Sequence, residues 1–145
     1  MFLGTYAADL DRENRLRAPA AFHLGASTQL FVMKGFERNL MVLTAGSFEA
    51  LSECLSSLNI ADPAARLLLR LSLGTAQPVR IDAEGALPLP DGLKAFAGLK
   101  ADLRIVGVGD YFEVWSGEKW SQQEMQIQDS EANSDRFAKL TLTTR

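Results

Sequence analysis

Short apolar runs of strand length, each bounded by turn-forming residues, occur in the same order twice along the chain. Residues 29–44, QLFVMKGFERNLMVLT, predict two strands around a glycine-containing turn, and residues 46–58 continue with a helical pattern for which Ser47 is a plausible N-cap. Residues 101–123 repeat this order, with Ser116 at the start of the second helix. The pattern indicates two similar halves, each of which ends in a strand pair and a helix.

A second repeated stretch precedes each strand pair. Residues 10–19, LDRENRLRAP, and residues 81–90, IDAEGALPLP, align without a gap and share an aspartate, a glutamate, a leucine and a proline at equivalent places. Asn14 and Gly85 also coincide, and both residue types readily adopt positive φ. Each stretch therefore predicts a tight turn between two short strands.

A helix is expected between the halves, within residues 60–74, IADPAARLLLRLSLG. Asp62 can cap this helix, Pro63 suits its first position, and Gly74 suits the position just past its end. Its many leucines leave few polar faces, which indicates burial on more than one side, with another subunit as one possible cover.

Each half thus contains a strand, a tight turn, a strand, a short helix or turn, a strand pair and a helix. Neither half has enough strands to bury its own apolar face, so we expect the strands to interleave about a pseudo-twofold axis into one small α+β barrel. The expected boundaries are a first half at 1–55, a connecting helix at 56–73, a second half at 74–128 and a mobile tail at 129–145.

Composition is typical of a soluble globular protein, with 47% hydrophobic and 23% charged residues. No apolar segment approaches the roughly 20 residues that span a bilayer. Residues 1–10 show no secretion signal, so we expect a cytoplasmic protein with no membrane partner. The formal net charge is −3, but residues 124–135 hold four carboxylates and no Lys or Arg, and without these four the chain would carry +1. A basic surface elsewhere is compatible with this distribution.

Catalytic and metal-binding patterns are poorly supported. His23, the only histidine, has no nearby His, Cys or carboxylate at ligand spacing, and Cys54, the only cysteine, is expected to be a small buried apolar residue of a helix. No G-x-S-x-G motif occurs, and GVGD at 107–110 is better explained by a hairpin turn than by a dinucleotide fingerprint. An enzyme is the least favoured class, and we expect no cofactor, metal or small-molecule substrate.

The first tight turn concentrates positive charge. Asp11 and Arg15 flank it closely enough for their side chains to meet, so the carboxylate can accept turn amides while it orients the guanidinium. Arg12, Arg15 and Arg17 then lie at a hairpin end, from which arginines can make two-point contacts in a DNA groove. The alternative is a solvated hairpin with ordinary surface charges. The neighbouring carboxylates support this alternative, because they reduce the positive potential of the turn.

Several segments stand in the order and spacing of one known family. They are MFLGTYAADLDRENRLRAP with its D-x-x-x-R motif, DPAARLLLRLSLG, IDAEGALPLP, AGL at 97–99 and VGVGDYFEVWSGEKW. Over residues 1 to about 123 the chain resembles the MraZ family, bacterial transcriptional regulators of the division and cell wall gene cluster. The resemblance implies two tandem AbrB-like (SpoVT-AbrB) halves in a swapped-hairpin, double-psi-like β-barrel with flanking helices. It also implies a ring-shaped homo-oligomer that binds promoter repeats in double-stranded DNA, in the cytoplasm at the nucleoid.

In the family both halves carry D-x-x-x-R, and the arginine contributes to DNA contact. Here Asp82 matches the second motif, but Ala86 stands where its arginine would be, and Pro88 stands opposite Arg17. The resemblance therefore favours the first half for DNA contact, through Arg12, Arg15 and Arg17, with Asp11 as an orienting residue. The second-half candidates are Arg80, Asp82 and Lys94, of which Arg80 and Lys94 could compensate for the missing arginine.

Two functions follow from these observations. The first is sequence-specific DNA binding, in which several modest turns on one ring act together. The alternative is a divergent structural or interaction protein that kept the barrel and lost operator binding, for which Ala86 is the main support.

Overall fold

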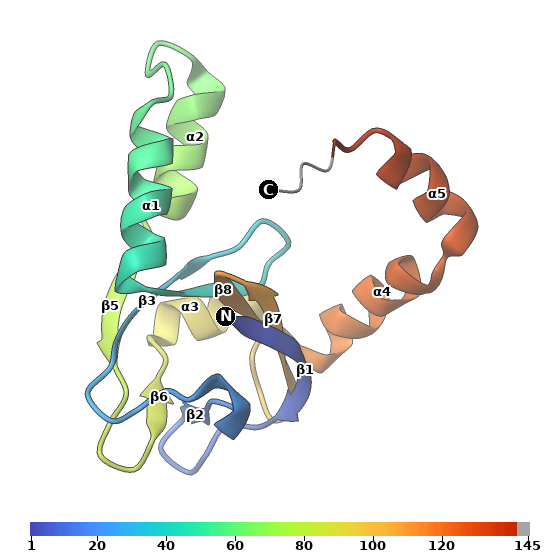
Figure 1. Cartoon of the computed structure of the whole chain (residues 1–145). Helices are drawn as coiled ribbons and strands as arrows, with labels where there is room; N and C mark the ends of the chain where they lie inside the picture. Colours follow the sequence, from blue (N-terminus) through green and yellow to red (C-terminus); the bar gives the residue numbers. More distant parts are fainter. Residues whose placement is uncertain (142–145) are drawn as a thin grey trace.

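The computed structural model describes residues 1–141, and its elements follow the expected repeated order (Figure 1). The first half contains β1 (Phe2–Ala8), β2 (Arg15–Arg17), a short 3-10 helix η1 (Ala20–Phe22), β3 (Gln29–Lys34), β4 (Leu40–Thr44) and α1 (Ala45–Ser56). The second contains β5 (Gln77–Arg80), β6 (Ala86–Pro88), α3 (Asp91–Ala97), β7 (Leu103–Gly109), β8 (Tyr111–Ser116) and α4 (Gly117–Gln128). Helix α2 (Pro63–Ser72) joins the halves, and α5 (Ser130–Ala138) follows α4.

The strands of the two halves interleave. A six-stranded antiparallel sheet has the order β1-β7-β8-β4-β3-β5, and β2 pairs with β6 in a separate two-stranded ribbon. The equivalent strands of the two halves are β1 and β5, β3 and β7, and β4 and β8. When each is exchanged for its equivalent, the strand order is the same read backwards, as expected for a pseudo-twofold axis between β4 and β8. The predicted α+β fold with interleaved halves is confirmed, and closure of the strands into a barrel stays a prediction.

The main core lies where the halves meet. Leu16 of β2 lies directly opposite Leu87 of β6, and both side chains are fully buried. The buried ring of Phe112 lies 5.2 Å from that of Phe2 and 5.1 Å from that of Phe22, measured between centroids. First-half and second-half residues therefore bury each other's apolar surface, which couples the stability of the two halves.

The connecting helix begins and ends as its sequence predicts. The Asp62 carboxylate accepts a hydrogen bond from the Ala64 amide at 2.9 Å, and Pro63 is the first helical residue. Gly74 lies just beyond the C-cap, where its amide donates to the Leu69 carbonyl at 3.0 Å.

The two strand-to-helix junctions are equivalent in space, which corrects one prediction. Ser116 caps α4 as expected and accepts from the Lys119 amide at 3.2 Å. The expectation that Ser47 caps α1 is wrong, because Thr44 is the N-cap and accepts from the Ser47 amide at 3.1 Å. Thr44 directly ends β4, as Ser116 directly ends β8, so the repeat places the cap at the end of the strand in both halves.

Two helical arms extend from the sheet (Figure 1). On the α1–α2 arm, the side chain of Cys54 is exposed, so its predicted burial is wrong. Leu67 of α2 is 65% exposed, and burial of this helix by another subunit stays a prediction. Helix α5 lies inside the segment 129–145, which was expected to be a mobile tail. Residues 142–145 of that segment fall outside the described residues, and the mobility of the tail stays a prediction. Within residues 1–141, no helix has the length and apolar character to span a membrane.

Candidate nucleic-acid interface

The two tight turns have the same hydrogen-bonded geometry. Oδ1 of Asp11 accepts the amides of Glu13 and Arg15, each at 2.9 Å. Oδ1 of Asp82 accepts the amides of Glu84 and Ala86, also at 2.9 Å each. The predicted positive φ is confirmed at both equivalent positions, where φ is 59° at Asn14 and 81° at Gly85.

These amide donors also keep the two aspartates charged. The Arg15 amide is the main cause that lowers the pKa of the Asp11 carboxyl, and the Ala86 amide has the same effect on the pKa of Asp82. Each turn therefore presents an ionised carboxylate whose second oxygen, Oδ2, is available to a cation.

One guanidinium, that of Arg15, joins the two turns. Its Nε donates to Oδ2 of Asp11 at 3.0 Å, as the sequence predicts. Its Nη1 donates to Oδ2 of Asp82 at 2.7 Å, and its Nη2 donates to Oε2 of Glu84 at 2.8 Å. These bonds raise the pKa of Arg15, and the hydrogen bond to Glu84 is the largest cause. Arg15 is thus held by carboxylates from both halves.

The pairing of β2 with β6 explains this arrangement. Because Leu16 lies opposite Leu87, the two turns lie next to each other at the same end of the ribbon. Ala86 leaves the second turn without an arginine of its own, and Asp82 pairs with Arg15 instead. Sequence reasoning missed the partners Asp82 and Glu84, although the gapless alignment of the turns was a signal that could have placed them together.

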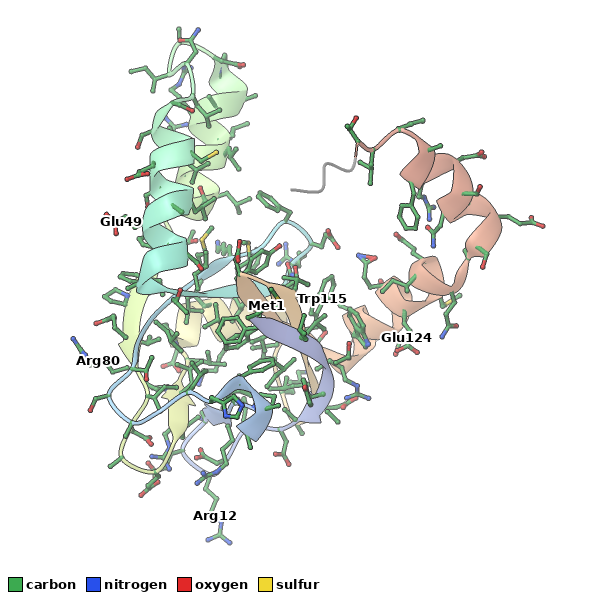
Figure 2. The ribbon with its side chains drawn as sticks, in the orientation of Figure 1. Met1, Arg12, Glu49, Arg80, Trp115 and Glu124 are labelled. Atoms are coloured by element: carbon green, nitrogen blue, oxygen red, sulfur yellow. The ribbon has the colours of Figure 1, made fainter. Side chains whose placement is uncertain are left out.

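Arg12 and Arg17 are the other cations of the turn. Arg12 is exposed and extends away from the body of the molecule (Figure 2). Within residues 1–141, none of the ion pairs involves Arg12. Arg17 is also exposed, and its Nη1 donates to the Glu84 carbonyl at 2.8 Å.

The remaining second-half candidates do not join this cluster. Arg80 ends β5, lies to one side of the molecule in Figure 2, and donates from Nη1 to the Ser27 carbonyl at 3.0 Å. Lys94 lies in α3 and pairs with Asp91 at 3.1 Å. Of the three second-half candidates, the structure brings only Asp82 into contact with the first turn.

The strand order and the two equivalent aspartate turns define a class of duplicated α+β proteins whose halves exchange strands. The family described as "MraZ protein, putative antitoxin-like" matches residues 1–71 and again residues 73–142. The chain belongs to the MraZ family, and the resemblance found in its sequence is confirmed.

Curated relatives match over most of their length. A protein of Thermomicrobium roseum is 38% identical over 123 residues, which cover 85% of this chain and 87% of the relative. A protein of Roseiflexus castenholzii is 35% identical over 138 residues, 95% of this chain and 94% of the relative. A third protein, from Leuconostoc mesenteroides, is 34% identical over 121 residues, which cover 83% of this chain and 85% of the relative. All three are named "Transcriptional regulator MraZ".

Proposed function

We propose that this chain is a transcriptional regulator that binds double-stranded DNA through its first-half turn. The observation that carries the proposal is the position of Arg15, whose guanidinium is oriented by carboxylates of both turns beside the exposed Arg12 and Arg17. The names of the relatives support regulation of transcription, which is not an enzyme class.

The proposed role of Arg15 follows from the unequal exposure of its partners. Asp11 and Asp82, which hold Nε and Nη1, are 25% and 28% exposed, whereas the Glu84 side chain at Nη2 is 62% exposed. A phosphate or a base edge can therefore replace Glu84 at Nη2 while the two aspartates continue to hold the other nitrogens. Arg12 and Arg17 add contacts to the DNA backbone, and Asp11 orients Arg15.

A single turn of this kind binds weakly, so the proposal includes a ring-shaped homo-oligomer. Copies of the first turn, spaced around a ring, contact successive promoter repeats, and their modest affinities combine when the spacings match. The expected place of action is the nucleoid in the cytoplasm.

The first prediction concerns salt and Arg12. We expect fluorescence anisotropy titrations to show selective binding to the chain's own upstream DNA over a scrambled duplex, with affinity that falls steeply as salt rises. Arg12→Ala should weaken binding to both duplexes similarly and lower the slope of log K against log salt by about 0.9 for each lost phosphate contact. Lys100→Ala removes an exposed positive charge from the α3–β7 connection and serves as the matched control. Failure of the intact protein to bind either duplex would refute the proposal.

A second candidate function is an interaction protein that no longer reads DNA. It is favoured by the local charge, because the three arginines of the paired turns are outnumbered by four carboxylates, those of Asp11, Glu13, Asp82 and Glu84. An oligomer that assembles normally but shows no salt-dependent affinity for DNA would support this function instead.

The second prediction tests whether Glu84 competes with DNA for Arg15. We expect Glu84→Gln to tighten DNA binding by about three- to tenfold, since it removes a negative charge and weakens the bond at Nη2. Glu13→Gln makes the same charge change in the first turn, where the carboxylate lies 3.7 Å from Nη1. It should tighten binding less, as measured by the same anisotropy titration. Equal gains in the two variants would show that only the summed charge matters.

A further inference from the structure

A polar cavity lies on a different part of the molecule from the paired turns. It has a volume of about 430 Å³ and is lined by residues of both the β3–β4 turn and helix α4. Its lining consists of Glu37 and Arg38 from the turn, Trp115 from β8, and Lys119 with three glutamines from α4. Figure 1 shows α4 leaving the sheet at some distance from the β2 and β6 turns.

Helix α4 turns a polar face toward this cavity. Lys119, Gln122, Gln123 and Gln126 are spaced at i, i+3, i+4 and i+7, which places them on one side of the helix. The large apolar residues Met125 and Ile127 of the same helix are exposed to solvent. A helix that is held against its domain by the hydrophobic effect buries its apolar side. In α4 this applies to the first turn, where Trp120 is buried and its ring centroid lies 5.5 Å from that of Trp115. Beyond that turn, Gln122 and Gln126 line the cavity with exposed side chains.

The cation from the β3–β4 turn is held by an aromatic ring. Arg38 has φ 56°, an uncommon conformation for a residue other than glycine. Its guanidinium carbon lies 5.0 Å from the centroid of the Phe96 ring, and Lys34 Nζ lies 4.5 Å from the same centroid. Stacking of this kind orients a guanidinium without consuming its N–H groups. Arg38 keeps those donors for another group.

The second cation also has free donors. Lys119 Nζ donates to the Ala97 carbonyl at 3.3 Å, which uses one of its three N–H groups. Within residues 1–141, neither Lys119 nor Arg38 belongs to an ion pair. Glu37 is the carboxylate in the lining, and it already accepts a hydrogen bond from the Gln123 amide. The lining therefore has a net positive charge in a chain whose net charge is −3.

We propose that this cavity binds a small organic anion, with its carboxylate or phosphate group held by Arg38 and Lys119. The amides of Gln122 and Gln126 hydrogen-bond its neutral polar groups. The cavity volume lies within the range of small-molecule sites, about 300–1,000 Å³. Because the ligand contacts both the β3–β4 turn and α4, its binding holds the C-terminal arm against the sheet. The ligand is an effector and not a substrate, and its binding does not depend on the DNA-binding proposal.

The full chain can be tested with citrate and inorganic phosphate as probes, at constant ionic strength. We expect one of them to cause saturable changes in the ¹H–¹⁵N NMR signal of the Trp115 indole, together with slower amide hydrogen exchange in α4. Arg38→Asn keeps a residue that tolerates positive φ and Lys119→Gln keeps a polar side chain, and each should weaken binding about tenfold. Lys100→Gln removes an exposed charge outside the cavity and should leave binding unchanged.

The two probes distinguish the sources of the anion. Saturation by citrate alone indicates a carboxylate ligand, and saturation by phosphate alone indicates a phosphorylated one. No saturable change with either probe overturns the proposal, as does equal weakening by Lys100→Gln. If Arg38→Asn lowers the melting temperature, Lys119→Gln decides the outcome, because that variant leaves the β3–β4 turn unaltered.

Discussion

Arg15→Ala is expected to reduce DNA affinity by about 10- to 100-fold while the fold stays intact. The variant loses the proposed contact at Nη2 and leaves the carboxylates of both turns without their shared cation, so the local potential becomes more negative toward phosphates. The fold is expected to survive because the second turn already has the same backbone hydrogen bonds with Ala86 in the equivalent position. Anisotropy titration measures the affinity, and circular dichroism checks the fold.

Arg15→Lys tests whether DNA binding needs only the positive charge of this side chain or also the planar shape of its guanidinium. Lysine keeps the positive charge but has no planar fork, so it cannot hold Asp11, Asp82 and Glu84 in their present arrangement. We expect its DNA affinity to fall between that of the unchanged chain and that of Arg15→Ala. Unchanged affinity in a well-folded Arg15→Ala protein would show that Arg15 does not contact DNA.

Leu16→Ala is expected to lower the free energy of unfolding by about 2–5 kcal/mol. Leu16 is 0% exposed and faces Leu87 across the ribbon that joins the halves, so the shortened side chain leaves a cavity at their shared core. Urea unfolding followed by circular dichroism at one fixed protein concentration provides the measurement. A single cooperative transition is expected, because each half buries part of the other.

The control for this variant is Leu67→Ala on the exposed face of α2. Leu67 is 65% exposed within the chain, so this substitution should change the free energy of unfolding by only about 0.5 kcal/mol. A Leu16→Ala protein no less stable than Leu67→Ala would mean that the ribbon does not hold the two halves together.

Local sequence signals predicted much of the fold. The Asp62-Pro63 start of α2, the strand pairs and the aspartate turns depend on residues close together in the chain, and the structure shows all of them. Interleaving was also predictable, because two equal halves that are too small for separate cores must share one.

Other features depend on contacts that are distant in sequence. Glu84 is 69 residues from Arg15, and their contact needs the register of β2 against β6, which hydrophobic pattern alone does not specify. The exposure of Cys54 was missed because an apolar helix pattern does not show which face lacks a neighbour. Thr44 was missed as a helix cap because threonine suits a strand as well as an N-cap, and here it lies at the boundary of both.

The sharing of Arg15 makes the two halves unequal partners. A chain built from two copies of the first half would place an arginine in each turn, whereas two copies of the second half would bring Asp82 and Glu84 together with their duplicates and no guanidinium at position 86. The carboxylates of the second turn are therefore neutralised by a guanidinium that the first half supplies, and the electrostatic balance of the second half depends on the first.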